Sequence, residues 1–104
     1  MSTRNLVHIL IADDDSDDCL MTRDAFRECE YGNPLHFVHD GEALLDYLKH
    51  RPPYTDETSY PLPGLILLDL NMPRMDGREA LLEIKADARL RSIPVVVFST
   101  SSAD

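Results

Sequence analysis

Short apolar runs alternate along the chain with segments whose apolar residues recur every three or four positions. The runs predict strands of a parallel sheet, because such strands are covered on both faces and lack a polar alternation. The segments with helical spacing predict amphipathic helices between the strands. The expected strands are residues 6–12, 35–39, 65–70 and 94–98, and the expected helices are residues 16–30, 41–50 and 78–88.

The same spacing predicts which face of each helix packs on the sheet. The residues expected on these faces are Cys19, Met21, Ala25, Phe26 and Cys29 in the first helix, Leu44, Tyr47 and Leu48 in the second, and Leu81, Ile84 and Ala88 in the third. Residues 51–64 form a loop that holds four of the seven prolines and has no apolar period. Tyr54 and Tyr60 in this loop either pack it against the domain or face a partner, and the sequence leaves both open.

Alternating strands and helices of these lengths predict an α/β fold. Each strand–helix–strand unit makes a right-handed crossover, which gives a parallel sheet with helices on both faces. Ligands bind such sheets beyond the carboxyl ends of the strands, where the strand order reverses. Polar residues at the strand ends are therefore the first candidates for function.

Three strand ends carry such residues. Asp13 and Asp14 follow the first strand, Asp69 ends the third, and Ser99 and Thr100 follow the fourth. Asp69 is preceded by apolar residues, and a carboxylate there is costly unless a cation neutralises it. Placing Asp69 beside the aspartates of the first strand adds like-charge repulsion. A hard divalent cation resolves both problems, and Mg²⁺ prefers oxygen ligands of this kind.

Each of these residues taken alone has a structural explanation. Asp13 and Asp14 could lie in a solvated loop, and Asp69 could cap a following turn. Asp17 and Asp18 favour the positive end of the first helix, with Asp15 or Ser16 as its cap. Only the joint placement of the acidic residues on one edge favours a metal site. None of the four histidines has the spacing of a ligand or catalytic group.

Charge and cysteine content narrow the partners. The chain has 19 acidic and 10 basic residues, a net charge of −9, and no basic run, so nucleic acid and acidic membrane surfaces are not expected as partners. The first apolar run is too short to span a bilayer and lacks the features of a signal peptide, which favours a cytoplasmic protein. Cys19 and Cys29 lie about 15 Å apart along one helix, too far for a disulfide. Both are expected to be small buried residues.

Three segments together resemble the receiver domains of two-component response regulators. They are Asp13-Asp14 after the first strand, the string from Leu67 to Gly77 that contains Asp-Leu-Asn-Met-Pro-Arg-Met-Asp-Gly, and the run from Ile93 to Ser99. The resemblance covers the whole chain in order and implies a flavodoxin-like sheet with strand order 2-1-3-4. The long proline-rich loop also resembles that of small single-domain regulators associated with bacterial phytochromes.

The resemblance implies a role for each site residue. Asp69 matches the phosphoacceptor, which takes a phosphoryl group from the phosphohistidine of a sensor histidine kinase. Asp14 matches the main Mg²⁺ ligand, Asp13 its companion, and Asn71 the residue whose backbone carbonyl completes the metal site. Ser99 matches the hydroxyl that binds the new phosphoryl group, with Thr100 as the alternative. No enzyme is implied beyond phosphoryl uptake from phosphohistidine or small donors and slow self-dephosphorylation.

One departure from the family pattern concerns the carboxyl terminus. The family has a lysine after a fifth strand, followed by a last helix, and neither occurs before Asp104. We therefore expect residues 1–104 to be one receiver domain that is truncated at its carboxyl terminus, with its fourth strand as an uncovered apolar edge. Output would pass to a downstream protein or a phosphotransfer protein, with a homodimer left open.

Two alternatives remain at this level. A degenerate receiver would act as a binding module without phosphorylation, an interpretation favoured by the missing lysine and weakened by the intact acidic residues. A haloacid-dehalogenase-like phosphatase also uses an aspartate nucleophile with Mg²⁺, and Asp13 to Asp15 contain its Asp-x-Asp pattern. That alternative leaves the string from Asp69 to Gly77 unexplained.

Overall fold

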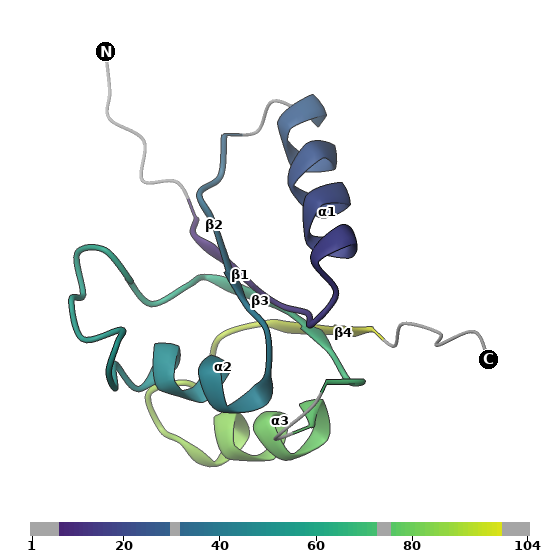
Figure 1. The fold of residues 1–104 in the computed structure, drawn as a ribbon. Helices are drawn as coiled ribbons and strands as arrows, with labels where there is room; N and C mark the ends of the chain where they lie inside the picture. Colours follow the sequence, from purple (N-terminus) through teal and green to yellow (C-terminus); the bar gives the residue numbers. More distant parts are fainter. Residues whose placement is uncertain (1–6, 30–31, 73–75, 99–104) are drawn as a thin grey trace.

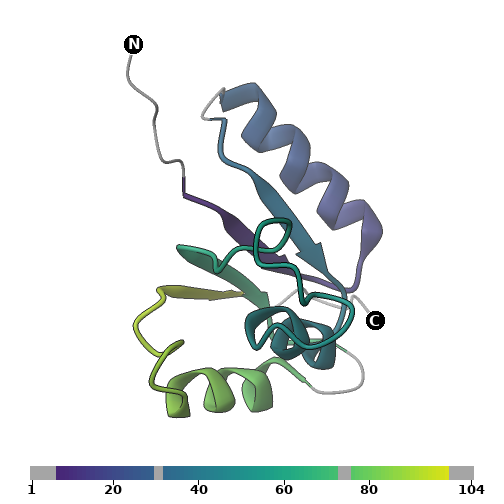
Figure 2. The ribbon, with the colours of Figure 1, turned by 90° about the vertical axis from the view of Figure 1, so that its left-hand side faces the viewer.

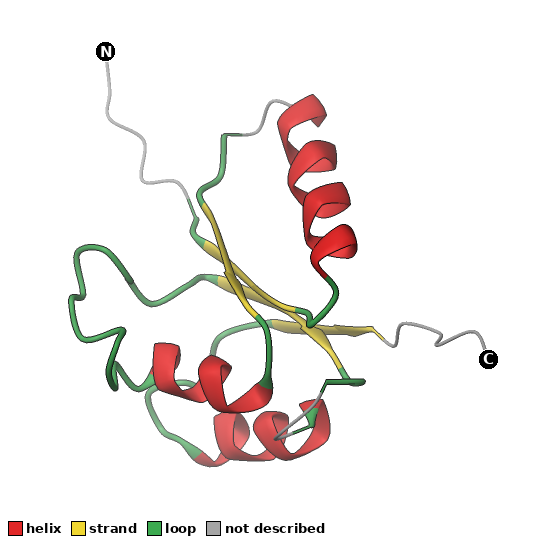
Figure 3. Ribbon diagram, viewed as in Figure 1, coloured by secondary structure: helices red, strands yellow, loops and turns green. Residues whose placement is uncertain are grey.

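The computed structural model describes residues 7–29, 32–72 and 76–98, which form four strands and three helices (Figure 3). All seven predicted elements are present, and most of their boundaries lie within three residues of the predicted ones. In chain order they are β1 (Ile9–Ala12), α1 (Ser16–Cys29), β2 (Leu35–Val38), α2 (Gly41–Leu48), β3 (Leu65–Asp69), α3 (Gly77–Ala86) and β4 (Val95–Phe98).

The four strands form one parallel sheet in the order β2-β1-β3-β4. Helix α1 covers one face of the sheet, while α2 and α3 lie side by side on the other (Figure 1). This arrangement confirms the predicted doubly wound α/β fold and its strand order. Because all strands run the same way, their carboxyl ends meet at one edge of the sheet, and residues just after β1 and β3 become neighbours.

The core lies between the sheet and the pair α2 and α3. Large members come from β1, β3, α2 and α3, and each is almost completely removed from solvent. They include Leu10, Ile66, Leu68, Leu44, Leu45, Leu48 and Ile84. Burial of each such side chain stabilises the fold by about 1.5–3 kcal/mol relative to an exposed position. The predicted apolar face of α2 is therefore confirmed.

Tyr54 and Tyr60 pack the proline-rich loop onto the domain. Both rings contact Tyr47 of α2, with centroid separations of 5.4 and 5.7 Å, and they contact each other at 5.1 Å. The Tyr47 hydroxyl donates a hydrogen bond to the Pro61 carbonyl, with the oxygens 3.0 Å apart. His50 adds a ring N–H bond to the Tyr60 carbonyl at 2.8 Å. Of the two possibilities left open by the sequence, loop packing is the observed one.

A histidine pair extends this cluster to the amino ends of β1 and β2. His8 Nδ1 lies 2.9 Å from His36 Nε2, although the two ring centroids are 5.2 Å apart and nearly parallel. The rings therefore meet edge to edge through an N–H···N hydrogen bond instead of stacking face to face. His36 also lies against Tyr47, at a centroid distance of 5.6 Å. Burial, with a smaller effect from His8, lowers the pKa of His36.

Two of the predicted helix faces are partly wrong. In α1, Met21 is 69% exposed and Ala25 is exposed, whereas Cys19, Thr22 and Phe26 turn toward the sheet. The Cys29 side chain lies outside the described residues. In α3, Ala80 and Ile84 are buried, while Ala88 is exposed and lies beyond the helix end.

The first error follows from geometry, because α1 contacts the sheet along positions three and four apart that start at Cys19 and include the polar Thr22. The second follows from the early end of α3 at Ala86. None of the described helices is both long and apolar enough to cross a bilayer.

Strand β4 lies at one edge of the described sheet and pairs with β3. Val96 is 52% exposed and Val97 is 44% exposed, as expected for an apolar strand with little covering it.

Cys19 of α1 is buried as predicted, and burial raises the pKa of its thiol to about 11. This thiol is therefore a core group with low reactivity.

Candidate functional site

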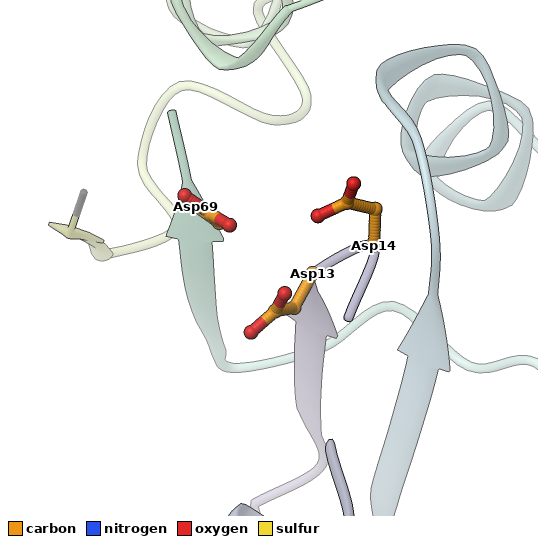
Figure 4. A group of neighbouring side chains, drawn as sticks. All are labelled: Asp13, Asp14 and Asp69. Carbon is orange, nitrogen blue, oxygen red and sulfur yellow. The ribbon is translucent and has the colours of Figure 1, made fainter. Parts of the chain in front are cut away.

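Three aspartates meet at the carboxyl edge of the sheet. Ala12 of β1 pairs with Leu68 of β3. The residues that follow them, Asp13 and Asp69, therefore lie side by side at the same level of the sheet. One oxygen from each of Asp13, Asp14 and Asp69 falls within 4.8 Å of the other two. Figure 4 shows the three carboxylates gathered between the ends of the two strands. The sequence-based prediction that these residues lie together is correct.

Two of these carboxylates are buried. Asp69 is 0% exposed and Asp13 is 2% exposed, while Asp14 is exposed to solvent. The backbone N–H of Asp15 donates to Asp13 Oδ1 at 2.9 Å, and that of Asn71 donates to Asp69 Oδ1 at 2.9 Å. Both bonds span two residues and form the side chain–backbone turn that aspartate favours. The bonds hold each buried carboxylate in place as the chain leaves its strand.

The pKa of Asp13 reflects its burial and the like charges around it. Burial is the main reason that this pKa is raised from 3.8 to about 6, and the nearby charges of Asp69, Asp18 and Asp14 contribute a smaller part of the rise. The hydrogen bond from Asp15 acts in the opposite direction. Desolvation and like charges both disfavour the ionised form, so a bound cation would relieve the site.

A small divalent cation fits this donor set. Mg²⁺ holds oxygen ligands at about 2.0–2.1 Å in an octahedron, so its ligand oxygens lie about 3 Å apart when adjacent and about 4 Å apart when opposite. Three carboxylate oxygens within 4.8 Å of one another need only small movements to reach these distances. The exposed Asp14 leaves one side open to solvent, where water or a phosphate oxygen can complete the shell.

The loop after Asp13 leads directly into α1. Asp15 Oδ1 accepts hydrogen bonds from the backbone N–H groups of Asp17 and Asp18, at 2.8 and 3.4 Å, so Asp15 acts as the helix cap. Asp17 and Asp18 occupy the first turn, where negative charge is favoured. Of the two predicted caps, Asp15 is the observed one. These residues therefore support α1 and lie outside the group of three carboxylates.

The loop after Asp69 is closed by Gly77, the first residue of α3. A Cβ at this position would lie 2.7 Å from the Asp69 carbonyl oxygen and 2.7 Å from the Leu70 Cα atom. The Gly77 N–H donates to the Leu70 carbonyl at 3.2 Å, and the Asp76 side chain caps α3 by accepting from the Glu79 N–H at 3.0 Å. Helix α3 is therefore held directly against the end of β3, beside the candidate site.

His39 is a neighbour of the site that sequence reasoning missed. Its Nδ1–H donates to the backbone carbonyl of Asp13 at 3.0 Å, and the Cys19 thiol contacts the same oxygen at 3.7 Å. The predicted strand order could have placed His39 here, because β2 lies next to β1 and His39 follows β2. This bond ties the ends of two strands together at the level of the acidic group.

Other predicted site residues are not part of the observed group. Asn71 is exposed, and its N–H supports Asp69, while its carbonyl remains a predicted ligand. Ser99 and Thr100 lie outside the described residues.

The comparisons with known proteins agree with this geometry. The family model of the response regulator receiver domain matches residues 9–104. The chain belongs to this family. It is 39% identical over 93 residues to the response regulator Rcp1 of a Synechocystis strain, a match that covers 89% of this chain and 61% of that protein. The chain spans about three fifths of the length of the curated relatives it matches.

Solved structures place this receiver domain near regulators that work with phytochromes. The phosphorylated cyanobacterial phytochrome response regulator RcpA superposes with a TM-score of 0.84 at 38% identity, covering 94% of this chain and 68% of that one. The Mn²⁺-bound form of Rcp1 superposes with a TM-score of 0.83 at 37% identity, with the same coverage. The predicted resemblance to receivers of the phytochrome-associated type is confirmed, and a receiver replaces the phosphatase alternative.

Proposed function

We propose that this receiver domain accepts a phosphoryl group on Asp69, with Mg²⁺ held by Asp13, Asp14 and Asp69. The observation that carries this proposal is the placement of a completely buried Asp69 within 4.8 Å of two other carboxylates at the carboxyl edge of the sheet. The Asn71 N–H holds one Asp69 oxygen at 2.9 Å. Asn71 would contribute its backbone carbonyl as a further metal ligand.

The transfer step requires positioning and neutralisation of charge. An Asp69 oxygen attacks the phosphorus of a phosphohistidine, the P–N bond breaks, and the imidazole nitrogen of the donor keeps the bonding electrons and takes a proton. Asp13 and Asp14 would hold an Mg²⁺ ion, which would supply the charge neutralisation that lets an anionic donor approach an anionic acceptor. The hydrogen bond from Asn71 limits the orientations that Asp69 can adopt.

Phosphorylation with a small donor tests the acceptor. After incubation with acetyl phosphate and Mg²⁺, intact mass spectrometry should show an adduct of about 80 Da, the mass of one phosphoryl group. Asp69→Asn should abolish the adduct. Asp76→Asn is the matched control, because asparagine also caps a helix and should leave the adduct in place. An adduct that survives Asp69→Asn contradicts the proposal, and no adduct on the wild-type protein favours a binding module without phosphorylation.

The response to phosphorylation is assigned to Ser99, with Thr100 as the alternative. A hydroxyl drawn toward the new phosphoryl oxygens would shift the end of β4 and the loop that follows. Ser99→Ala should still accept phosphoryl from acetyl phosphate but should lose most of the amide shifts produced by a phosphoryl mimic. Equal shifts with and without Ser99 would move this role to Thr100.

The donor that we propose is a sensor histidine kinase of the phytochrome type, because the structures of phytochrome response regulators are so similar to this chain. Output would pass by protein contact, to a downstream partner, a phosphotransfer protein or a second copy of the chain. Phosphotransfer from a phosphorylated phytochrome kinase, followed over seconds and compared with a kinase of another class, tests the donor. Equal rates from both kinases would contradict this assignment.

A further inference from the structure

A groove of about 440 Å³ lies between α1 and the edge strand β2, away from the acidic site. Figure 2 shows β2 running beside α1 at this edge of the molecule. The walls of the groove carry two arginines, three apolar side chains and one side-chain amide. They are Arg23, Arg27, Phe26, Leu35, Phe37 and Asn33. The groove therefore combines positive charge with an apolar floor.

The two arginines stand out in a chain with a net charge of −9. The ion pairs seen among the described residues are Lys49–Glu83 and Arg51–Asp46, so neither groove arginine pairs with a carboxylate there. Arg23 lies over the Phe37 ring at 5.4 Å, a cation–π contact that holds its guanidinium at the groove. Because neither guanidinium is paired with a carboxylate of the described chain, a negatively charged occupant is favoured.

The backbone of β2 adds a second recognition element. In the described sheet β2 has β1 on one side only. The carbonyls of Pro34 and Val38 accept hydrogen bonds from β1. Since successive residues of a strand point their N–H and C=O groups to opposite sides, those of Leu35 and Phe37 point to the open edge. The residues that form the apolar floor therefore also offer free strand-pairing groups.

We propose that this edge binds an extended segment of a partner protein, in which glutamates alternate with β-branched residues. Such a segment adds to β2 as a fifth strand and bonds to the outward backbone groups of Leu35 and Phe37. Alternate side chains of an added strand lie about 6.6 Å apart on one face. Arg23 and Arg27 are separated by about 6 Å along α1, so successive glutamates reach both guanidinium groups.

The apolar floor favours glutamate over aspartate in this segment. The methylene groups of a glutamate can cover Leu35 and Phe37, which are only half-buried, while its carboxylate reaches the arginines. Asp24 and Glu28 follow the two arginines in the chain but do not line the groove, so they do not repel the segment from within it. A partner segment with lysine in place of glutamate would not form ion pairs with the two arginines.

A synthetic octapeptide of alternating threonine and glutamate tests this surface. Titration into the ¹⁵N-labelled protein should shift the amides of Leu35 and Phe37 most and slow their hydrogen exchange. His36 and Val38 are internal controls, because their amides face β1. The R23Q/R27Q variant should bind about tenfold more weakly, as expected for the loss of two exposed ion pairs. R89Q/R91Q, with the same change in net charge, should bind within about twofold of the wild type.

Three further measurements decide between occupants. A threonine–lysine octapeptide should not bind, and rising salt should weaken the glutamate peptide because the arginines are exposed. Equal binding of both peptides, an equal loss in R89Q/R91Q, or no shifts at millimolar peptide would overturn the proposal. Shifts of Leu35 and Phe37 that grow with protein concentration alone would assign the edge to a second copy of the chain instead.

Discussion

The two ends of the parallel sheet have opposite electrostatic character. At the carboxyl edge, Asp13, Asp14 and Asp69 crowd three like charges together, and two of them are buried. At the amino edge, His8 and His36 are joined by a hydrogen bond, and Tyr47, which contacts His36, has its hydroxyl bonded to a carbonyl. Among the described residues, the first edge concentrates negative charge that a bound cation would relieve, whereas the polar side chains named at the second edge are hydrogen-bonded within the protein. We therefore expect changes at the carboxyl edge to affect metal binding and changes at the amino edge to affect the stability of the fold.

The largest effect is expected at the amino edge. Tyr47 is 1% exposed and contacts His36, Tyr54 and Tyr60. Tyr47→Ala should lower the free energy of unfolding by about 3–5 kcal/mol, since it leaves a cavity at the centre of the cluster. Tyr47→Phe, which loses only the bond to Pro61, should cost about 1 kcal/mol. Denaturant unfolding measures both, and metal affinity of the folded Tyr47→Phe variant should stay unchanged.

The second effect concerns metal binding at the carboxyl edge. Asp14→Ala should weaken Mg²⁺ binding about 100-fold, because it removes one of three charges that hold the cation. Asp17→Ala removes the same charge from the first turn of α1, outside the group of three, and should have a much smaller effect. Calorimetric titration compares the two variants. Equal losses would mean that the acidic residues act as a diffuse field and form no defined site.

The third effect reverses the usual cost of a mutation. The folded-state pKa of Asp13 is about 6 against 3.8, so its ionisation opposes folding at every pH above this interval. Asp13→Asn should therefore raise the metal-free stability by about 1–2 kcal/mol at pH 7.5. The gain should shrink as the pH falls through 6 and vanish below 3.8, where both states of the wild type bind the proton.

Thermal melts with a chelator, repeated at several pH values, measure this gain. Excess Mg²⁺ should stabilise the wild type but not the Asp13→Asn variant. A variant that is less stable than the wild type at pH 7.5 without metal would show that Asp13 is not under electrostatic strain.

The smallest effect is the pH response of the histidine pair. Because the pKa of His36 is lowered in the fold, the unfolded chain binds more protons below about pH 6.5, and stability falls as the pH falls. His36→Gln should flatten this dependence between pH 7 and 5 by less than about 1 kcal/mol. His39→Gln serves as the comparison, because it replaces a ring that is bonded to the Asp13 carbonyl at the opposite edge of the sheet. An unchanged slope in His36→Gln would show that His36 does not govern the pH dependence of stability in this range.

The carboxyl edge could be predicted from the sequence because it depends on local patterns. The first and third apolar runs each stop at an acidic residue, and parallel strands bring their ends together whatever the details of packing. Asp13 and Asp69 could therefore be placed as neighbours although 56 positions separate them, since Ala12 pairs with Leu68.

The amino edge could not be predicted in the same way. The bond between His8 and His36, and the packing of Tyr54 and Tyr60 on Tyr47, join residues that no periodicity connects. The face of α1 was predicted only in part, for a related reason. Apolar spacing pointed to Met21, while the sheet contacts a line of residues that includes the polar Thr22.

The tight contact between α3 and the end of β3 also predicts how the chain tolerates change. Any side chain at position 77 must push apart the backbone that carries Asp69 and Leu70, and no flexible group is available to yield. In a library that samples every amino acid at each position, selection for a folded protein should keep glycine there alone. The neighbouring Asp76 should exchange freely with serine, threonine or asparagine, which cap a helix equally well. Position 76 would then accept several residues, whereas position 77 would accept glycine alone.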